Sequence, residues 1–446
     1  MSVVAPLIYY YNVWDAQRFP FLSNSIFYVN KTTGVSDIYP QSYVLNSDNS
    51  LNYTRLEEIG PPRYPATGGL QYVFINFSVT AAITHVILYH GKDLGKSLLR
   101  EWTKLRGGKV LADDKVDIHM RLMSAYDEVP TSWYYTIYAI GIILNIIVAY
   151  VNHSQLPWWG VLFAIGMSSV LSLPLNFISA VTGTSFGLNV VAEMICGFVF
   201  EGYPVANIYF KTLGFNTMNQ AGVMAMDLKI GHYLKVPPRI VFWNQMIGTV
   251  IGCIFNYIVN DTIIENKKDI LLGKGNNVWS GASFQTINSA AITWGAIGPM
   301  AMFGPRSMYH IVLWAFVIGF FLPLPTWLLH KRFPTVGFDN VNIPMVITGL
   351  SFMPGGNSSY VTVSFVIMLF SQWYLKQRHR AWFVKHNYLI SAALDSGTSL
   401  MAFFLAMAVE GGQSGKSYPF PTWFGNTDSQ MKDYCCAECP PETYGD

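Results

Sequence analysis

Apolar stretches long enough to cross a lipid bilayer recur along most of this 446-residue chain. Charged residues make up 12% of the chain, about half the usual share of a soluble domain. Inside hydrocarbon every backbone polar group has to be paired within the chain, so spanning segments of this kind are helices. The sequence therefore predicts an all-α polytopic membrane protein with a single membrane domain over residues 1–446.

About ten full spans are predicted, together with a partial span and a broken helix. The partial span is the apolar run at residues 1–10, which looks like the last turns of a helix. Gly and Pro interrupt the apolar stretch 286–307, so we expect a re-entrant or discontinuous helix there. The full spans are predicted at about 70–90, 132–151, 158–181, 187–203, 205–227, 238–260, 308–329, 340–355, 358–376 and 387–410.

Basic residues set the expected orientation of these spans. Residues 91–130 are hydrophilic and contain eight Lys and Arg, four of them between Lys96 and Arg106. The positive-inside rule makes this segment a cytoplasmic loop. Alternation along the chain then predicts that the polar loop 11–69 and the polar tail 411–446 are extracytoplasmic.

Residues 229–239 form a cationic hinge, broken by two prolines, between two of the predicted spans. Pro237 and Pro238 cannot continue a helix, but they suit the start of the next one. Arg239 then lies in the first turn of that helix, where the macrodipole disfavours a cation. We therefore expect a compensating interaction for Arg239: the cytoplasmic interface, anionic lipid or a bound anion.

Ionisable groups inside the predicted spans are the first candidates for function because they are costly in a membrane. Glu193 lies in the middle of a span, and Glu201 follows eight residues later, so the two carboxylates are predicted to share a helix face. A carboxylate that binds and releases a proton at membrane depth is what proton-coupled transport requires. The alternative is a neutral Glu that is hydrogen-bonded to a neighbouring helix.

Other polar groups in the spans are candidates as well. Asp395 is surrounded by small residues, which also fits a hydrogen bond within close helix packing. Asn244 and Gln245 follow the hinge, and their amides suit either a peptide backbone or hydrogen bonds between helices. His85 shares the first full span with Asn76, and a lone histidine in a span is more often a packing residue than a proton relay.

Cysteines and sequence motifs indicate neither a metal site nor an enzyme. Cys196 and Cys253 fall in predicted spans and are expected to be small, buried hydrophobic residues. Cys435, Cys436 and Cys439 cluster in the tail without the second ligand pair that a zinc site needs. The sequence has no nucleophile elbow, phosphate loop or zinc-protease motif. Its basic residues flank spans instead of forming a surface for nucleic acid.

Several ordered segments resemble the oligopeptide transporter family, in particular its fungal and plant branch of peptide transporters. The hinge segment Lys235-Val236-Pro237-Pro238-Arg239 is similar to the family's Lys-Ile-Pro-Pro-Arg signature, with Val236 in place of Ile. Further similar stretches are Tyr10–Trp14, Leu188–Glu193, Tyr203–Asn207, Phe210–Gly214, Trp294–Pro299 and Asn387–Asp395.

Two departures from the family pattern accompany this resemblance. Glu201-Gly-Tyr-Pro204 stands where the family usually has Pro-Gly-Arg-Pro, which removes a cation and adds an acid. The family's Asn-Pro-Gly signature and its first several spans have no counterpart here. The chain therefore resembles the C-terminal portion of the family's fold.

The resemblance implies proton-driven uptake of small oligopeptides, typically tetra- and pentapeptides or glutathione, across the plasma membrane. The expected partners are the peptide, protons and the lipid bilayer. The resemblance leaves open whether the chain forms a homo-oligomer. No cofactor is expected besides the proton gradient. Lys235 and Arg239 are candidates for binding a peptide's carboxylate, and Glu193 for its ammonium or for the proton. The alternatives are a metal-chelate transporter of a related branch and a truncated fragment that does not transport.

Overall fold

The computed structural model describes residues 4–23, 25–31, 33–106, 117–266, 268–269, 271, 281–351 and 358–409. The described residues up to 351 form one compact unit, and residues 358–409 form a second. Helices dominate both units, which confirms the predicted all-α fold class. Five described helical stretches are long and apolar enough to span a membrane: Ala66–Arg100, Thr131–Val151, Trp158–Thr182, Pro238–Asn266 and Ile311–Arg332.

The segment before the first long helix is folded, although the sequence predicted only a polar loop. Its elements are α1 (Val4–Tyr10), η1 (Val13–Arg18), β1 (Phe27–Val29), β2 (Ser36–Ile38), α2 (Gln41–Val44) and α3 (Tyr53–Ile59), with β1 and β2 antiparallel. Ile26, Tyr39 and Leu51 are buried in one apolar cluster with Trp294 and Phe303. The sequence pattern missed this region because its strands are very short and the residues that cover them come from a distant part of the chain.

The first long helix is built from α4 (Ala66–His85), the π-helical turn η2 (Val86–His90) and α5 (Gly91–Leu105). α4 packs against α15 (Ile311–Phe321) and α17 (Ile343–Ser351). Gly319 allows α15 to approach closely, since a Cβ added there would lie 2.7 Å from the Phe77 carbonyl oxygen. Asn76 is fully buried and donates from Nδ2 to the Val312 carbonyl oxygen at 2.9 Å. Small residues and a polar side chain thus fix this helix pair.

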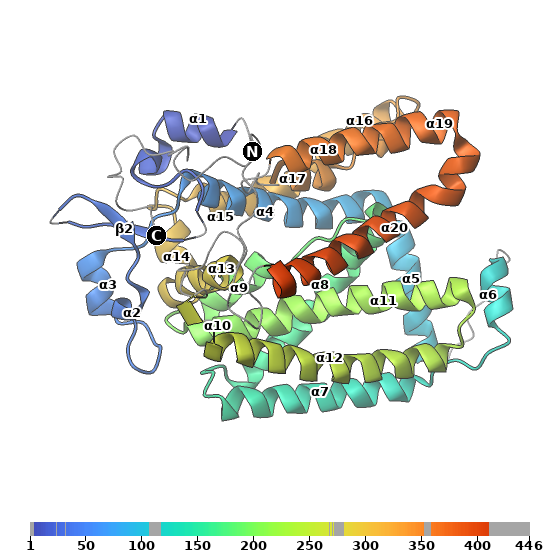
Figure 1. The fold of residues 1–446 in the computed structure, drawn as a ribbon, viewed down its shortest axis with the longest axis horizontal. Coiled ribbons are helices and arrows are strands. Elements are labelled where there is room, and N and C mark those ends of the chain that lie inside the picture. Colours follow the sequence, from blue (N-terminus) through green and yellow to red (C-terminus); the bar gives the residue numbers. More distant parts are fainter. Residues whose placement is uncertain are drawn as a thin grey trace. The chain divides into compact units, whose positions relative to one another are not determined.

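The middle of the chain contributes mostly long helices. They are α6 (Ile118–Met123), α7 (Thr131–Val151), α8 (Trp158–Thr182), α9 (Asn189–Val199), α10 (Pro204–Lys211), η3 (Thr212–Asn216), α11 (Thr217–Leu234) and α12 (Pro238–Asn266). Figure 1 shows α7, α11 and α12 running in nearly the same direction as α4. The predicted spans at 132–151, 158–181 and 238–260 agree with α7, α8 and α12 within a few residues.

The broken helix predicted at 286–307 is confirmed. It consists of α13 (Ala282–Ala290), the π-helical segment η5 (Ala291–Ile297) and α14 (Pro299–Phe303). Every residue of η5 is buried. Gly298 ends this segment with φ 88° and ψ 153°, a conformation that is open essentially to glycine alone. The chain continues through α15, α16 (Pro323–Arg332), η6 (Phe338–Asn340) and α17.

The second unit is a short helical stretch. It contains α18 (Ser358–Met368), η7 (Leu369–Leu375), α19 (Lys376–Arg378), α20 (Arg380–Phe404) and η8 (Leu405–Val409). The predicted spans at 358–376 and 387–410 fall on these helices.

The cysteine predictions are only partly confirmed. Cys196 on α9 is buried, as expected, whereas Cys253 on α12 is exposed. The reason is that most of α12 lies on the surface of its unit, where an apolar side chain has no covering neighbour. Cys435, Cys436 and Cys439 lie outside the described residues.

Candidate transport site

A buried ion pair joins the two short helices α9 and α10. Lys211 Nζ lies 2.6 Å from Glu193 Oε1, and the two side chains are 13% and 2% exposed. Taking two charges out of water is costly, and their mutual attraction has to offset that cost. Glu193 was predicted from the sequence as a candidate, and the structure assigns it a cationic partner.

Lys211 was not predicted as a site residue, although the sequence contains a signal for it. It is a cation inside the predicted span 205–227, and a charge in a span is expected to pair with another charge. Glu193 lies in the preceding span, and consecutive helices joined by a short turn are usually neighbours. Combining these two rules would have identified the pair.

Asn207 holds the two helices together beside the ion pair. Its side chain is fully buried, and Nδ2 donates to the Glu193 carbonyl oxygen at 2.8 Å. Asn207 precedes Lys211 by one helical turn, so both residues lie on the same face of α10. The Asn207 side chain on α10 therefore fixes the backbone of α9 at Glu193.

Glycines bring η5 into backbone contact with the same two helices. A Cβ added to Gly295 would lie 2.5 Å from the Asn207 Cβ and 2.9 Å from the Pro204 Cα. A Cβ added to Gly197 on α9 would overlap the carbonyl oxygen of Trp294. η5 thus packs closely against both α9 and α10, the two helices that carry the Glu193–Lys211 pair.

Aromatic side chains pack against Trp294 and Thr293 of η5. The rings of Trp294 and Phe303 are stacked with centroids 4.4 Å apart, and Tyr72 meets Trp294 edge-on at 5.4 Å. The Tyr64 hydroxyl donates to Thr293 Oγ1 at 2.6 Å. Trp294, Phe303 and Tyr64 are buried, and the Tyr64 hydroxyl has the hydrogen-bond partner that a buried tyrosine usually finds.

Glu201 does not share a helix face with Glu193, which corrects the prediction from the sequence. α9 ends at Val199, and Glu201 lies exposed in the turn that follows. Gly202 in this turn has φ 94°, a backbone conformation that favours glycine. The Glu201 carboxyl group lies against Gly298, because a Cβ added to that glycine would be 2.7 Å from the Glu201 Cδ.

The same turn connects the N-terminal region to η5 through backbone hydrogen bonds. The Gly202 N–H donates to the Gly295 carbonyl oxygen, and the Leu51 N–H donates to the Gly202 carbonyl oxygen, each at 2.9 Å. The turn is therefore fixed on both sides.

The cationic hinge is stabilised by residues of the segment 117–130, which precedes α7. Lys235 ends α11 in the left-handed conformation with φ 63°, and α12 begins at Pro238 as predicted. Lys235 Nζ lies 2.7 Å from His119 Nδ1. Arg239 pairs with Asp127 at 3.3 Å and donates from Nε to the Glu128 carbonyl oxygen at 3.2 Å. The compensation expected for Arg239 thus includes a carboxylate of the chain itself.

Asn244 and Gln245 lie together at a shallow pocket between α11 and α12. Gln245 Nε2 donates to Asp227 Oδ2 at 2.6 Å, and all three side chains line the pocket, whose volume is about 330 Å³. Asp227 was not predicted as a site residue. The Gln245–Asp227 hydrogen bond joins α12 to α11, which matches one of the two roles expected for Gln245. The Asn244 amide is exposed at the pocket.

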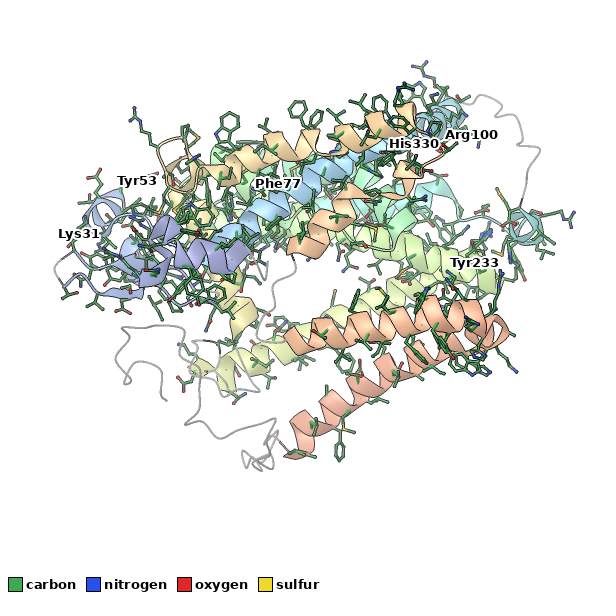
Figure 2. All side chains as sticks on the ribbon, turned by 90° about the horizontal axis from the view of Figure 1, so that it is seen from above. Lys31, Tyr53, Phe77, Arg100, Tyr233 and His330 are labelled. Carbon is green, nitrogen blue, oxygen red and sulfur yellow. The ribbon has the colours of Figure 1, made fainter. Side chains whose placement is uncertain are left out.

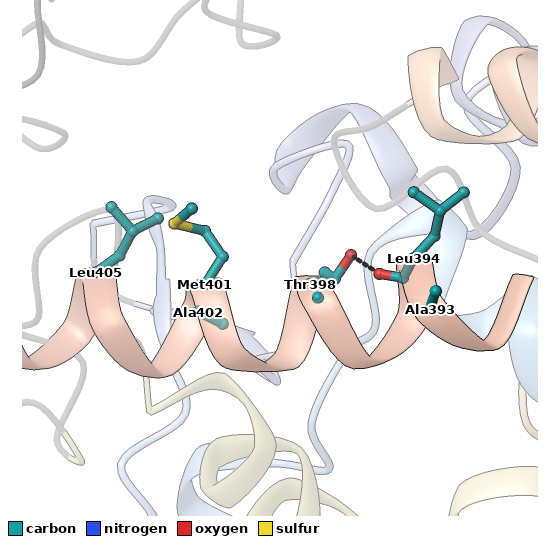
Figure 3. Close-up of a pocket in the computed structure, with 7 residues that line it drawn as sticks. Ala393, Leu394, Thr398, Met401, Ala402 and Leu405 are labelled. Atoms are coloured by element: carbon teal, nitrogen blue, oxygen red, sulfur yellow. Dashed lines mark hydrogen bonds between the residues drawn. The ribbon is translucent and has the colours of Figure 1, made fainter. Parts of the chain in front are cut away.

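Asp395 belongs to the second unit and is exposed on α20. Figure 3 shows one face of this helix, where the Thr398 hydroxyl donates to the Leu394 carbonyl oxygen at 2.8 Å. That face carries small and apolar side chains, and Asp395 does not line it. A role of Asp395 in proton coupling stays a prediction.

His85 is buried near the end of α4 and stacks on Tyr89, with ring centroids 4.4 Å apart. Its Nδ1 has no hydrogen-bond partner among the described residues. Among all the residues that the structure describes, no group of three or more His, Cys, Asp or Glu is placed to hold a metal ion.

These features define an all-α polytopic membrane protein with a buried charge pair beside a discontinuous helix, an arrangement in which membrane transporters build their sites. The chain belongs to the oligopeptide transporter family. The family model described as OPT oligopeptide transporter protein matches residues 1–409.

Named relatives agree with this assignment. Oligopeptide transporter 3 of Arabidopsis thaliana is 32% identical over 451 residues, covering 98% of this chain and 57% of the relative. Glutathione transporter 1 of Schizosaccharomyces pombe is 33% identical over 431 residues, covering 95% and 48%. Sexual differentiation process protein isp4 of the same yeast is 30% identical over 430 residues, covering 95% and 51%. The chain spans about half the length of these relatives, and no solved structure matches it.

Proposed function

We propose that this chain acts in proton-coupled transport of small oligopeptides, of the size of tetra- and pentapeptides or glutathione, across the plasma membrane. The observation that carries the proposal is the buried Glu193–Lys211 ion pair. The names of the relatives support a peptide cargo, since they include oligopeptide transporters and a glutathione transporter.

The ion pair supplies a simple way to couple the transport of a peptide to the transport of a proton. A peptide's terminal carboxylate is an alternative partner for Lys211, and a cation–carboxylate contact is a strong charge-assisted hydrogen bond. When the peptide takes Lys211, Glu193 loses its counter-charge and a buried carboxylate without one binds a proton. Peptide and proton then enter together, and both leave when the Glu193–Lys211 pair re-forms.

The surrounding backbone suits this exchange. Asn207 and the close glycine contacts hold Glu193 and Lys211 in position, so that the side chains can change partner while the helices stay together. The buried aromatic cluster at η5 stabilises this segment while the partners change.

Uptake of a labelled pentapeptide and of labelled glutathione, measured in acidic and in neutral medium, tests the proposal. Cells that lack their own peptide uptake would express the chain, E193Q or K211M. We expect higher uptake in acidic medium for the unaltered chain, loss of this pH dependence in E193Q, and loss of peptide uptake in K211M. E265Q is a matched control, because Glu265 is exposed on α12, and it should behave like the unaltered chain.

Two results would contradict the proposal. Absence of uptake by the unaltered chain would exclude transport by it, and unchanged pH dependence in E193Q would exclude coupling through Glu193. Uptake of a labelled iron chelate that unlabelled pentapeptide does not inhibit would assign the cargo to metal chelates instead.

A further inference from the structure

The helix that contains α4 continues far beyond the length that the hydrocarbon core requires. The helical stretch Ala66–Arg100 covers 35 residues. At about 1.5 Å per residue a straight helix of this length would extend roughly 50 Å, whereas the hydrocarbon core is about 30 Å thick. The part of this helix that contains α5 therefore has to lie outside the hydrocarbon.

α5 does not continue in the direction of α4. Figure 1 shows α4 running horizontally, as α7, α11 and α12 do, whereas α5 runs vertically. The π-helical turn η2 separates α4 from α5, and π-helical turns are a common cause of such a bend. A helix that runs across the direction of the spanning helices has the orientation of a helix lying in the membrane surface.

Figure 2 shows at which end of the first unit α5 lies. Arg100 of α5 lies at the same end as Tyr233 and His330. Lys31 and Tyr53 of the N-terminal region lie at the opposite end. By the positive-inside rule, the end with α5 faces the cytoplasm.

One face of α5 is apolar and only partly covered. Leu94, Leu98 and Trp102 follow one another at intervals of four residues, which places them on one face. Leu94 packs against a buried apolar cluster. Leu98, Leu99 and Trp102 are 46%, 65% and 54% exposed. Large exposed apolar side chains that gather on one helix indicate a binding surface.

The opposite face of α5 is cationic. Lys92, Lys96 and Arg100 also follow at intervals of four residues and are exposed, with Asp93 as the acid in the first turn. Arg106, just after the helix, lies 4.6 Å from the ring centroid of Trp102. A basic face, leucines and a tryptophan on one helix are the features that bind a helix to anionic lipid at the membrane interface.

We propose that α5 binds the anionic headgroups of the cytoplasmic leaflet. Leu98 and Trp102 enter the boundary between headgroups and acyl chains, and Lys92, Lys96 and Arg100 contact phosphates and carboxylates of the lipid. This surface is separate from the Glu193–Lys211 pair and does not depend on peptide transport. Its occupant is lipid because the charge of the helix complements an anionic leaflet and the helix continues directly from a membrane span.

Hydrogen–deuterium exchange of the full chain in vesicles tests this inference. The vesicles contain phosphatidylcholine alone, or phosphatidylcholine with phosphatidylserine. We expect amides of residues 91–106 to exchange at least tenfold more slowly in the anionic vesicles, since three basic side chains are then attracted to the charged surface. High salt should remove the difference. The variant K92Q/K96Q/R100Q should lose it, and the charge-preserving control K92R/K96R should keep it.

Two outcomes would overturn the proposal. Equal exchange of residues 91–106 in neutral and anionic vesicles would show that the helix does not select anionic lipid. Equal protection of K92Q/K96Q/R100Q and the unaltered chain would show that protein or neutral lipid covers this face. Peptide uptake does not enter either readout, so the result is independent of the proposed transport function.

Discussion

Gly295 lies directly against Asn207, because a Cβ added to the glycine would be only 2.5 Å from the Asn207 Cβ. Asn207 in turn donates to the backbone of Glu193. The buried segment η5 is therefore connected, through one glycine and one amide, to the helix that carries the buried carboxylate. Pro204 gives this contact little room to relax, since its Cα would lie 2.9 Å from the same added atom.

Gly295→Ala should destabilise the protein by about 1–3 kcal/mol, because the added methyl group overpacks the contact with Asn207 and Pro204. The free energy of unfolding in detergent, followed by tryptophan fluorescence, measures this loss. Gly248→Ala is the matched control, since no heavy atom of a neighbour lies within 4 Å of its added Cβ. It lies inside α12, so we expect a gain of roughly 0.5–1 kcal/mol. Similar effects of the two substitutions would contradict the close contact at Gly295.

The Glu193–Lys211 pair predicts a non-additive response to substitution. Lys211→Met leaves the Glu193 carboxylate buried without a partner, and Glu193→Gln leaves the Lys211 ammonium in the same state. Each should cost about 3–5 kcal/mol of unfolding free energy, whereas the double variant should cost clearly less than their sum. Thermal unfolding of the four proteins forms a double-mutant cycle. Additive losses would show that the two charges do not stabilise each other.

Features with a local cause could be predicted from the sequence. Apolar length located α7, α8 and α12, and the glycines and prolines of 286–307 predicted the break that η5 occupies. Pro238 predicted the start of α12, because proline fits the first turn of a helix and interrupts its interior. The family assignment also rested on such local segments.

Features that depend on contacts between distant residues could not be predicted in the same way. Glu201 was placed on the helix of Glu193 because hydropathy does not show that α9 ends at Val199. The N-terminal region has the composition of a polar loop, and Tyr39 is buried in an apolar cluster whose other members include η5 residues from much later in the chain. Asp127, the partner of Arg239, lies in a hydrophilic segment where sequence alone gives no pairing.

Arg239→Gln should change stability little. The Arg239 and Asp127 side chains are 46% and 79% exposed, and ion pairs at the surface contribute about 0–1 kcal/mol. Asp127→Asn should have an effect of the same size, measured by thermal unfolding. Peptide uptake is the second readout, and we expect both variants to retain it. Loss of uptake in Arg239→Gln alone, at unchanged stability, would instead assign Arg239 a direct contact with the peptide.

The orientation of the first unit predicts which exposed positions an impermeant thiol reagent can reach from outside the cell. Val35 is 62% exposed in the N-terminal region, and Lys96 is exposed on α5. In a background whose five native cysteines are replaced, Val35→Cys should be labelled on intact cells, and Lys96→Cys only after the membrane is permeabilised. The physical reason is the excess of Lys and Arg at the end that carries α5. Labelling of Lys96→Cys on intact cells would reverse the orientation and place the leaflet bound by α5 on the outer side.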